Sequence, residues 1–226
     1  MRLPGLPALC LALIAATASA AEYGHYDPKR LLTVSETPAG RKYGLDGVYL
    51  DRMLNDLSVH AKNYPPQFDS GEDRQRAEHD VKALAGMLDI ALGGPTQNPD
   101  LLVRAAALQG IAHNLDIPGS AEKADALFRK LLAAQPGDAR GSYLYGTFLA
   151  ASARPKEALP HLDRALAAGV ADAAYTLGMV HLSLGNREQA LRSLEDYKRR
   201  KPDDASVDRL IEAIRNGKIE IRNRPG

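Results

Sequence analysis

Apolar residues follow a spacing of three and four along most of the second half of the chain, with short breaks at proline, glycine or aspartate. This spacing is typical of amphipathic helices. It predicts helices that start near residue 99 and then cover about 120–135, 139–152, 155–168, 171–184, 187–200 and 204–216. Aromatic residues make up 5% of the chain and tryptophan is absent. Such a composition favours packed helices over a sheet.

Three sets of positions recur at the same two spacings, 34 and then 32 residues. Each set has one member in each of three successive helix pairs. They are a small residue in the first helix, an alanine in the second helix, and an apolar residue four positions after that alanine. The sets are Ala112, Gly146 and Gly178; Ala124, Ala158 and Ala190; and Phe128, Leu162 and Leu194. Agreement of three sets on two unequal spacings indicates an internal repeat.

This pattern resembles the tetratricopeptide repeat over roughly residues 105 to 204, with Pro136 and Pro202 at repeat ends. The resemblance implies an all-α fold, a right-handed α-solenoid of antiparallel helix hairpins. The small residue would let the second helix cross closely, with its alanine at the contact. The middle repeat lacks the final proline, and Gly169 is expected to end its helix. Its junction with the next repeat also resembles Sel1-like repeats.

Two further helices are predicted before the repeats and do not fit the repeat register. One covers about Leu45 to Lys62, and the second starts after a capping serine, Ser70. Val48 is among the apolar positions expected to face inward on the first of them. The predicted organisation is a signal peptide 1–20, an extended arm 21–43, a non-repeat helical pair 44–97, three repeats 98–204, a capping helix 205–216 and a tail 217–226.

The first twenty residues have the features of a secretory signal. Arg2 precedes a short apolar run, and Ala18 and Ala20 supply the small residues that a signal peptidase reads. Cleavage after Ala20 would remove Cys10, the only cysteine, so no disulfide is expected. We therefore expect a periplasmic protein. No later segment approaches 18 uninterrupted apolar residues, so no membrane span is expected in the mature chain.

Charge and motifs argue against several function classes. The chain has 29 basic and 28 acidic residues, and removal of Arg2 with the signal makes the two counts equal. This balance gives no electrostatic case for binding nucleic acid. No nucleophile or phosphate-loop motif is present, so we expect neither catalysis nor a cofactor. The six histidines are scattered without a helical pair, which argues against a metal site.

The resemblance implies that the first helices of the repeats line a concave groove for a protein or peptide partner in the cell envelope. Carrying the repeat register over gives these groove residues: Gln109, His113, Arg140, Tyr143, Thr147, Tyr175, Met179, Leu182 and Arg209. An adaptor or scaffold is the first hypothesis. A self-associating structural subunit is the alternative, and a ligand binder or enzyme that uses the N-terminal region is the third. The partner and the oligomeric state stay open.

The ends of the mature chain carry no repeat pattern. Tyr23, His25, Tyr26 and Asp27 cluster near the expected new N-terminus, and we expect them to belong to a flexible arm that docks on the helices or on a partner. Residues 218–222 alternate between polar and apolar like a short strand. Disorder is the default for such a terminal segment. It could also dock on the repeats or add to the edge of another protein's sheet.

Overall fold

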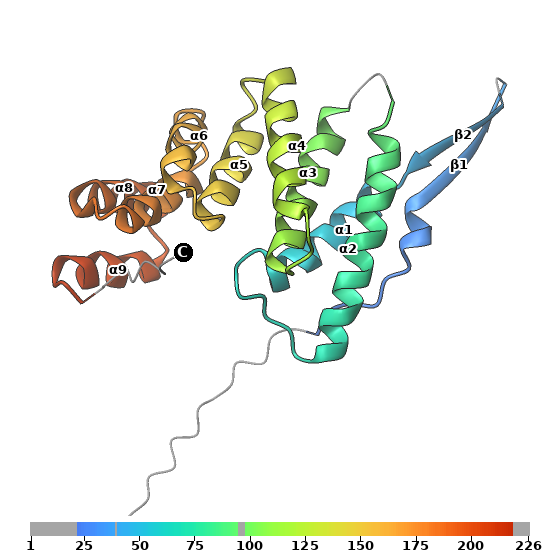
Figure 1. The fold of residues 1–226 in the computed structure, drawn as a ribbon. Coiled ribbons are helices and arrows are strands. Elements are labelled where there is room, and N and C mark those ends of the chain that lie inside the picture. Colours follow the sequence, from blue (N-terminus) through green and yellow to red (C-terminus); the bar gives the residue numbers. More distant parts are fainter. Residues whose placement is uncertain (1–21, 39, 95–97, 219–226) are drawn as a thin grey trace, which may run out of the picture.

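The computed structural model describes residues 22–38, 40–94 and 98–218 (Figure 1). The expected signal peptide, its cleavage site and residues 219–226 of the tail lie outside this part of the chain. The helices are η1 (Pro28–Leu31), α1 (Gly47–Ala61), α2 (Gly71–Ala91), α3 (Pro99–Asn114), α4 (Ser120–Ala134), α5 (Ala139–Ala151), α6 (Pro155–Ala167), α7 (Asp172–Ser183), α8 (Arg187–Arg200) and α9 (Ala205–Arg215). The strands are β1 (Leu32–Thr37) and β2 (Gly40–Leu45).

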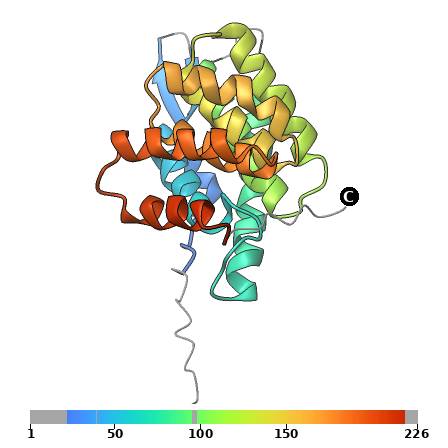
Figure 2. The same ribbon diagram turned by 90° about the vertical axis from the view of Figure 1, so that its left-hand side faces the viewer.

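Helices α3 to α8 form three antiparallel pairs, α3 with α4, α5 with α6 and α7 with α8. The pairs follow one another across the molecule, and α9 packs against α8 at the far end (Figures 1 and 2). The observed helix ends lie within a few residues of the predicted ones. As expected, Gly169 follows the end of α6, with a positive φ of 93°. The helical solenoid that the resemblance implied is therefore confirmed.

The glycines in the middle of α5 and α7 allow the two helices of a pair to approach closely. A Cβ atom added to Gly146 would lie 2.6 Å from Cγ of Leu162. The equivalent atom on Gly178 would lie 2.6 Å from Cγ of Leu194. The sequence led us to expect an alanine at this contact, but the nearest side chain is the leucine four positions later. A larger side chain at either glycine would push the helices apart.

The turn before the second helix of each pair adds a fourth set of repeated positions. Gly119, Ala153 and Gly185 have φ values of 77°, 58° and 77°, in the left-handed region. Their spacings are again 34 and 32 residues. Glycine adopts this conformation freely, whereas an alanine there is strained. The turn in the middle repeat therefore has the same backbone conformation as the turns in its neighbours, although it carries Ala153 where they carry glycine.

Helices α1 and α2 both pack against α3 and extend the stack at its N-terminal end. Arg104 on α3 holds Asp51 on α1 through two hydrogen bonds, of 2.7 and 2.8 Å. The side-chain amide of Asn114 donates to the carbonyl of Ala61 at 2.9 Å. These contacts place α1 beside α3.

The segment before α1 differs from the extended arm that we expected. It starts with the buried Tyr23, forms η1, and continues into an antiparallel hairpin in which Leu32 pairs with Leu45 and Thr37 with Gly40. Threonine and valine in β1 favour a strand, and Gly40 takes a φ of 111° next to the turn. The sequence showed no clean hydrophobic period here because the chain passes from a short helix to two strands and then to α1 within a few residues.

The prediction that Val48 faces inward on α1 is wrong. Val48 is 75% exposed, whereas Tyr49 and Leu50 are buried. Val48 stands in the first turn of α1, directly after the hairpin, where no neighbouring helix covers it. The inward face of α1 therefore begins one residue later than the sequence suggested.

The close crossing at α5 and α6 predicts the effect of one added methyl group. Gly146→Ala should destabilise the protein by about 1–3 kcal/mol, because the new Cβ would overlap the side chain of Leu162. Gly86 lies inside α2 and has open space around its Cα, so Gly86→Ala should stabilise by about 0.5–1 kcal/mol. Urea unfolding of both variants measures the difference. Equal effects of the two substitutions would contradict the close crossing.

Candidate functional site

The nine residues expected in the groove differ widely in exposure. Arg140 on α5 and Arg209 on α9 are exposed, and Met179 on α7 is 38% exposed. His113, Tyr143, Thr147, Tyr175 and Leu182 are half-buried. Gln109 is only 4% exposed, so it is removed from any surface that a guest could touch. The accessible part of the predicted groove therefore begins at α5 and continues over α7 to α9.

The two groove tyrosines also hold the repeats together. Tyr143 packs against a core cluster with buried residues from all three repeats, and Tyr175 packs against the cluster that includes α9. The ring of Tyr175 lies 5.3 Å from that of Tyr197, at an angle of 62°. Tyr197 in turn donates a hydrogen bond to Asp204 at 3.0 Å. Burial, together with this bond, raises the pKa of Tyr197 to about 12.

A small hollow of about 130 Å³ lies between α1, α3 and α5. Ser58 from α1 and Lys62 directly after it line the hollow together with Gly110 and Asn114 from α3. The hydroxyl of Thr147 on α5 is buried at this hollow and has no hydrogen-bond partner. An unpaired buried hydroxyl costs free energy that a bound donor or acceptor would recover. The sequence could not show that α1 contributes here, because α1 lies outside the repeat register.

His113 lines a different hollow, so the structure separates it from Thr147. This second hollow, of about 840 Å³, lies between α4 and the turn from α5 to α6. Asp125 accepts hydrogen bonds there from Tyr145 at 2.8 Å and from Arg154 at 2.7 Å, and Arg129 lies 2.7 Å from its other oxygen. Burial acts to raise the pKa of Asp125, but the bonds from Arg154 and Tyr145 outweigh it and lower the pKa. Asp125 thus links the first two repeats.

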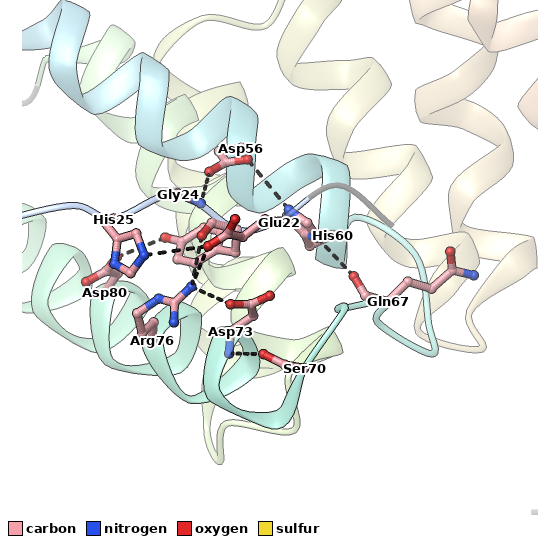
Figure 3. A network of polar contacts seen from close by, with 11 residues as sticks. Glu22, Gly24, His25, Asp56, His60, Gln67, Ser70, Asp73, Arg76 and Asp80 are labelled. Atoms are coloured by element: carbon pink, nitrogen blue, oxygen red, sulfur yellow. Dashed lines mark hydrogen bonds and ion pairs between the residues drawn. The ribbon is translucent and has the colours of Figure 1, made fainter. Parts of the chain in front are cut away.

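The N-terminal cluster docks on the helices, which is one of the two arrangements that the sequence suggested: Tyr23 and Tyr26 join a polar network with α1 and α2, whereas His25 and Asp27 are exposed (Figure 3). Tyr23 is fully buried, and its hydroxyl donates to Asp80 on α2 at 2.9 Å. The backbone N–H of Gly24 and the hydroxyl of Tyr26 both donate to Asp56 on α1, each at 2.9 Å. The segment therefore joins α1 to α2 through hydrogen bonds to a carboxylate on each helix.

His60 completes this network from α1. Its ring stacks on Phe68 at 5.0 Å and 7°, and its Nδ1 lies 3.0 Å from the carbonyl oxygen of Gln67 (Figure 3). Nε2 lies 3.6 Å from Oδ1 of Asp56. A histidine beside an aspartate could suggest acid–base chemistry. Here Asp56 holds the N-terminal segment through Gly24 and Tyr26. His60 packs between Phe68 and the ring of Tyr23, which indicates a structural role.

Two features that would indicate other functions are absent from the described residues. Among residues 22–38, 40–94 and 98–218, no three histidine, aspartate or glutamate side chains converge as metal ligands would. Within the same residues, no helix combines the length and the apolar character that crossing a membrane requires.

The Tyr23–Asp80 bond predicts a pH-dependent loss of stability. Burial raises the pKa of Asp80, and the bond from Tyr23 opposes that rise. Tyr23→Phe should therefore leave the ionised carboxylate without its donor and cost about 1.5–3 kcal/mol at neutral pH. A carboxyl group with a raised pKa in the folded state stabilises folding when protonated, so this cost should shrink as the pH falls towards the unfolded value of about 4.

Chemical unfolding of wild type and variant at pH 7 and pH 4 measures this cost. Tyr43→Phe is the matched control, because Tyr43 is 71% exposed, and it should change nothing at either pH. The same loss for Tyr23→Phe at both pH values would show that Asp80 does not titrate through this contact.

Comparisons with known proteins agree with the repeat geometry. Residues 149–214 match the family model described as tetratricopeptide repeat. The crystal structure of MamA superposes with a TM-score of 0.55 at 23% identity, covering 67% of this chain and 86% of that one. YrrB, titled a TPR protein with an unusual peptide-binding site, gives 0.51 at 19% identity, with 73% and 82% covered. The search of curated proteins found no match.

The extent of the YrrB superposition bears on the N-terminal helices. A share of 73% of 226 residues is about 165 residues, more than the 119 from residue 98 to residue 216. The similarity in fold therefore reaches beyond the three repeats. The matching model over residues 149–214, the helix pairs and the shared fold agree that this chain contains tetratricopeptide-like repeats.

Proposed function

We propose that this chain is a periplasmic adaptor that binds a peptide or a segment of a protein partner along the first helices of its repeats. The periplasmic location rests on the pattern of residues 1–20. Solenoid proteins use their extended concave surfaces for binding, and one structural neighbour carries a peptide-binding site according to its title. Identities of 23% and 19% support a shared fold alone, so the support for a binding surface comes from this chain's own residues.

The observation that carries the proposal is that positions of the repeat register on α5, α7 and α9 keep accessible side chains, while Thr147 on α5 borders the hollow beside α1. The accessible side chains are Arg140, Met179 and Arg209. The unpaired hydroxyl of Thr147 lies at the hollow. Two arginines and an exposed thioether suit a segment that carries both acidic and apolar side chains.

The two rival hypotheses have different support. The N-terminal region is filled by its own side chains around Tyr23, which argues against a ligand site within that network. A 520 Å³ hollow beside it, lined by His25, Arg76 and His79, is shallow and open to solvent. For self-association, the exposed hairpin of β1 and β2 offers a surface separate from the groove.

A site-specific crosslink tests the adaptor hypothesis. A photoreactive residue at Met179 should give a discrete adduct with one periplasmic protein in cells, because this side chain is exposed on α7. Arg140→Glu combined with Arg209→Glu should lower the yield of that adduct about tenfold, which corresponds to about 1.4 kcal/mol of binding free energy.

Two control variants make the equivalent changes on other surfaces of the molecule. A photoreactive residue at Ile90, 83% exposed on α2, should not give the adduct. Lys130→Glu combined with Lys156→Glu reverses two charges on the second helices α4 and α6 and should leave the yield unchanged. If Ile90 gave the same adduct, or if both double variants lowered the yield equally, the groove would not be the binding surface. Thermal melting of each variant verifies that it is folded.

A further inference from the structure

The hairpin formed by β1 and β2 projects from the helical body with both of its faces in water (Figure 1). Every residue of β1 is exposed, and in β2 only Leu45 is half-buried. A two-stranded ribbon without a covering layer is marginally stable in water. The hairpin therefore offers a surface that further strands would complete.

The register divides the hairpin into two different faces. Leu32 pairs with Leu45 and Val34 with Tyr43, so these side chains share one face. Leu32, Val34 and Tyr43 are 56%, 58% and 71% exposed. The residues between them on β1 are hydroxyl side chains and form the opposite face: Thr33, Ser35 and Thr37. One face of the ribbon is thus an exposed apolar patch, which in a soluble protein marks an interaction surface.

The two edges of the hairpin differ in how they are protected. Charged side chains and glycine discourage the pairing of an edge strand with another chain. β2 carries Arg41 and Lys42 together with glycines at positions 40 and 44. β1 carries no lysine, arginine, proline or glycine, and its single charge, Glu36, is paired with Arg41 at 2.9 Å. The free edge of β1 is therefore the one open to a further strand.

The C-terminal tail of this chain has the sequence that fits this edge. Residues 218–222 alternate between Lys218, Glu220 and Arg222 on one side and Ile219 and Ile221 on the other. We propose that this segment of one copy adds as a third strand to the β1 edge of a second copy. Main-chain hydrogen bonds would give the affinity and the alternating side chains the register.

The faces of the two segments are complementary in this arrangement. The isoleucines would extend the apolar face of Leu32 and Val34. The charged side chains would lie beside Thr33 and Ser35, which carry no charge. On the β2 edge these side chains would lie beside Gly40, Lys42 and Gly44. The glycines offer no side chain to pack against, and two of the three charges, Lys218 and Arg222, have the same sign as Lys42. Side-chain packing and charge therefore favour the β1 edge.

The tail reaches a second copy more readily than its own hairpin. The described chain ends at Lys218 beside α9, and Figure 1 shows α9 and the hairpin at opposite ends of the molecule. The eight remaining residues span at most about 28 Å when fully extended, whereas three repeats of helices packed at about 8–10 Å separate the two ends. The contact is therefore between different surfaces of two copies, and it would extend into a row of chains.

Light scattering of the purified chain tests this proposal. The average mass should exceed that of one chain and rise with concentration. Val34→Lys should bring it to one chain by placing a charge on the apolar face, and so should Ile219→Asp combined with Ile221→Asp. Mixing these two variants should restore pairs and nothing larger, because each variant retains one intact half of the contact.

Matched controls separate this contact from other causes. Asn223→Asp combined with Gly226→Asp adds the same charge to the tail without changing its alternation, and Val59→Lys changes a valine that is 65% exposed on α1. Both should associate like the wild type. A wild-type mass of one chain at the highest soluble concentration would overturn the proposal. So would a mixture without pairs, which would indicate hairpin-to-hairpin or tail-to-tail contacts instead. Circular dichroism shows whether each variant keeps its helices.

Discussion

The close approach of the two helices within a pair is the constraint on which the rest of the structure depends. At Gly146 and Gly178 the second helix lies so near that its leucine occupies the space of a side chain. A single helix pair would leave its other apolar side in water, so each pair packs against the next and the repeats stack. The stacking aligns the first helices side by side, and this alignment produces the surface that we assign to a partner.

A stack of this kind must be closed at both ends, and the two ends are closed in different ways. At the C-terminal end α9 buries Val207, Ile211 and Ile214 and leaves its other side in water. At the N-terminal end the gap between α1 and α2 is filled by the chain that precedes them. Tyr23 and Leu31 are fully buried there. The hydrogen bonds from this segment to both helices make it part of the fold.

The sequence predicted the repeats well because their determinants are local. Spacing, caps and prolines decide where helices begin, and Asn98 caps α3 just before the predicted start of that helix near residue 99. The N-terminal region depends on contacts between distant residues, such as the bond from Tyr23 to Asp80. Such contacts leave no period in the sequence. The repeat register likewise placed Gln109 in the groove, but its exposure of 4% depends on packing that the register does not record.

A double-mutant cycle on Gly146 and Leu162 tests the central claim most directly. If Gly146→Ala destabilises the protein because its methyl group meets the leucine side chain, Leu162→Ala should remove most of that destabilisation. We expect the double variant to be more stable than the sum of the two single losses implies, by about 1 kcal/mol or more. Additivity within about 0.3–0.5 kcal/mol would show that the two side chains do not meet and would contradict the account.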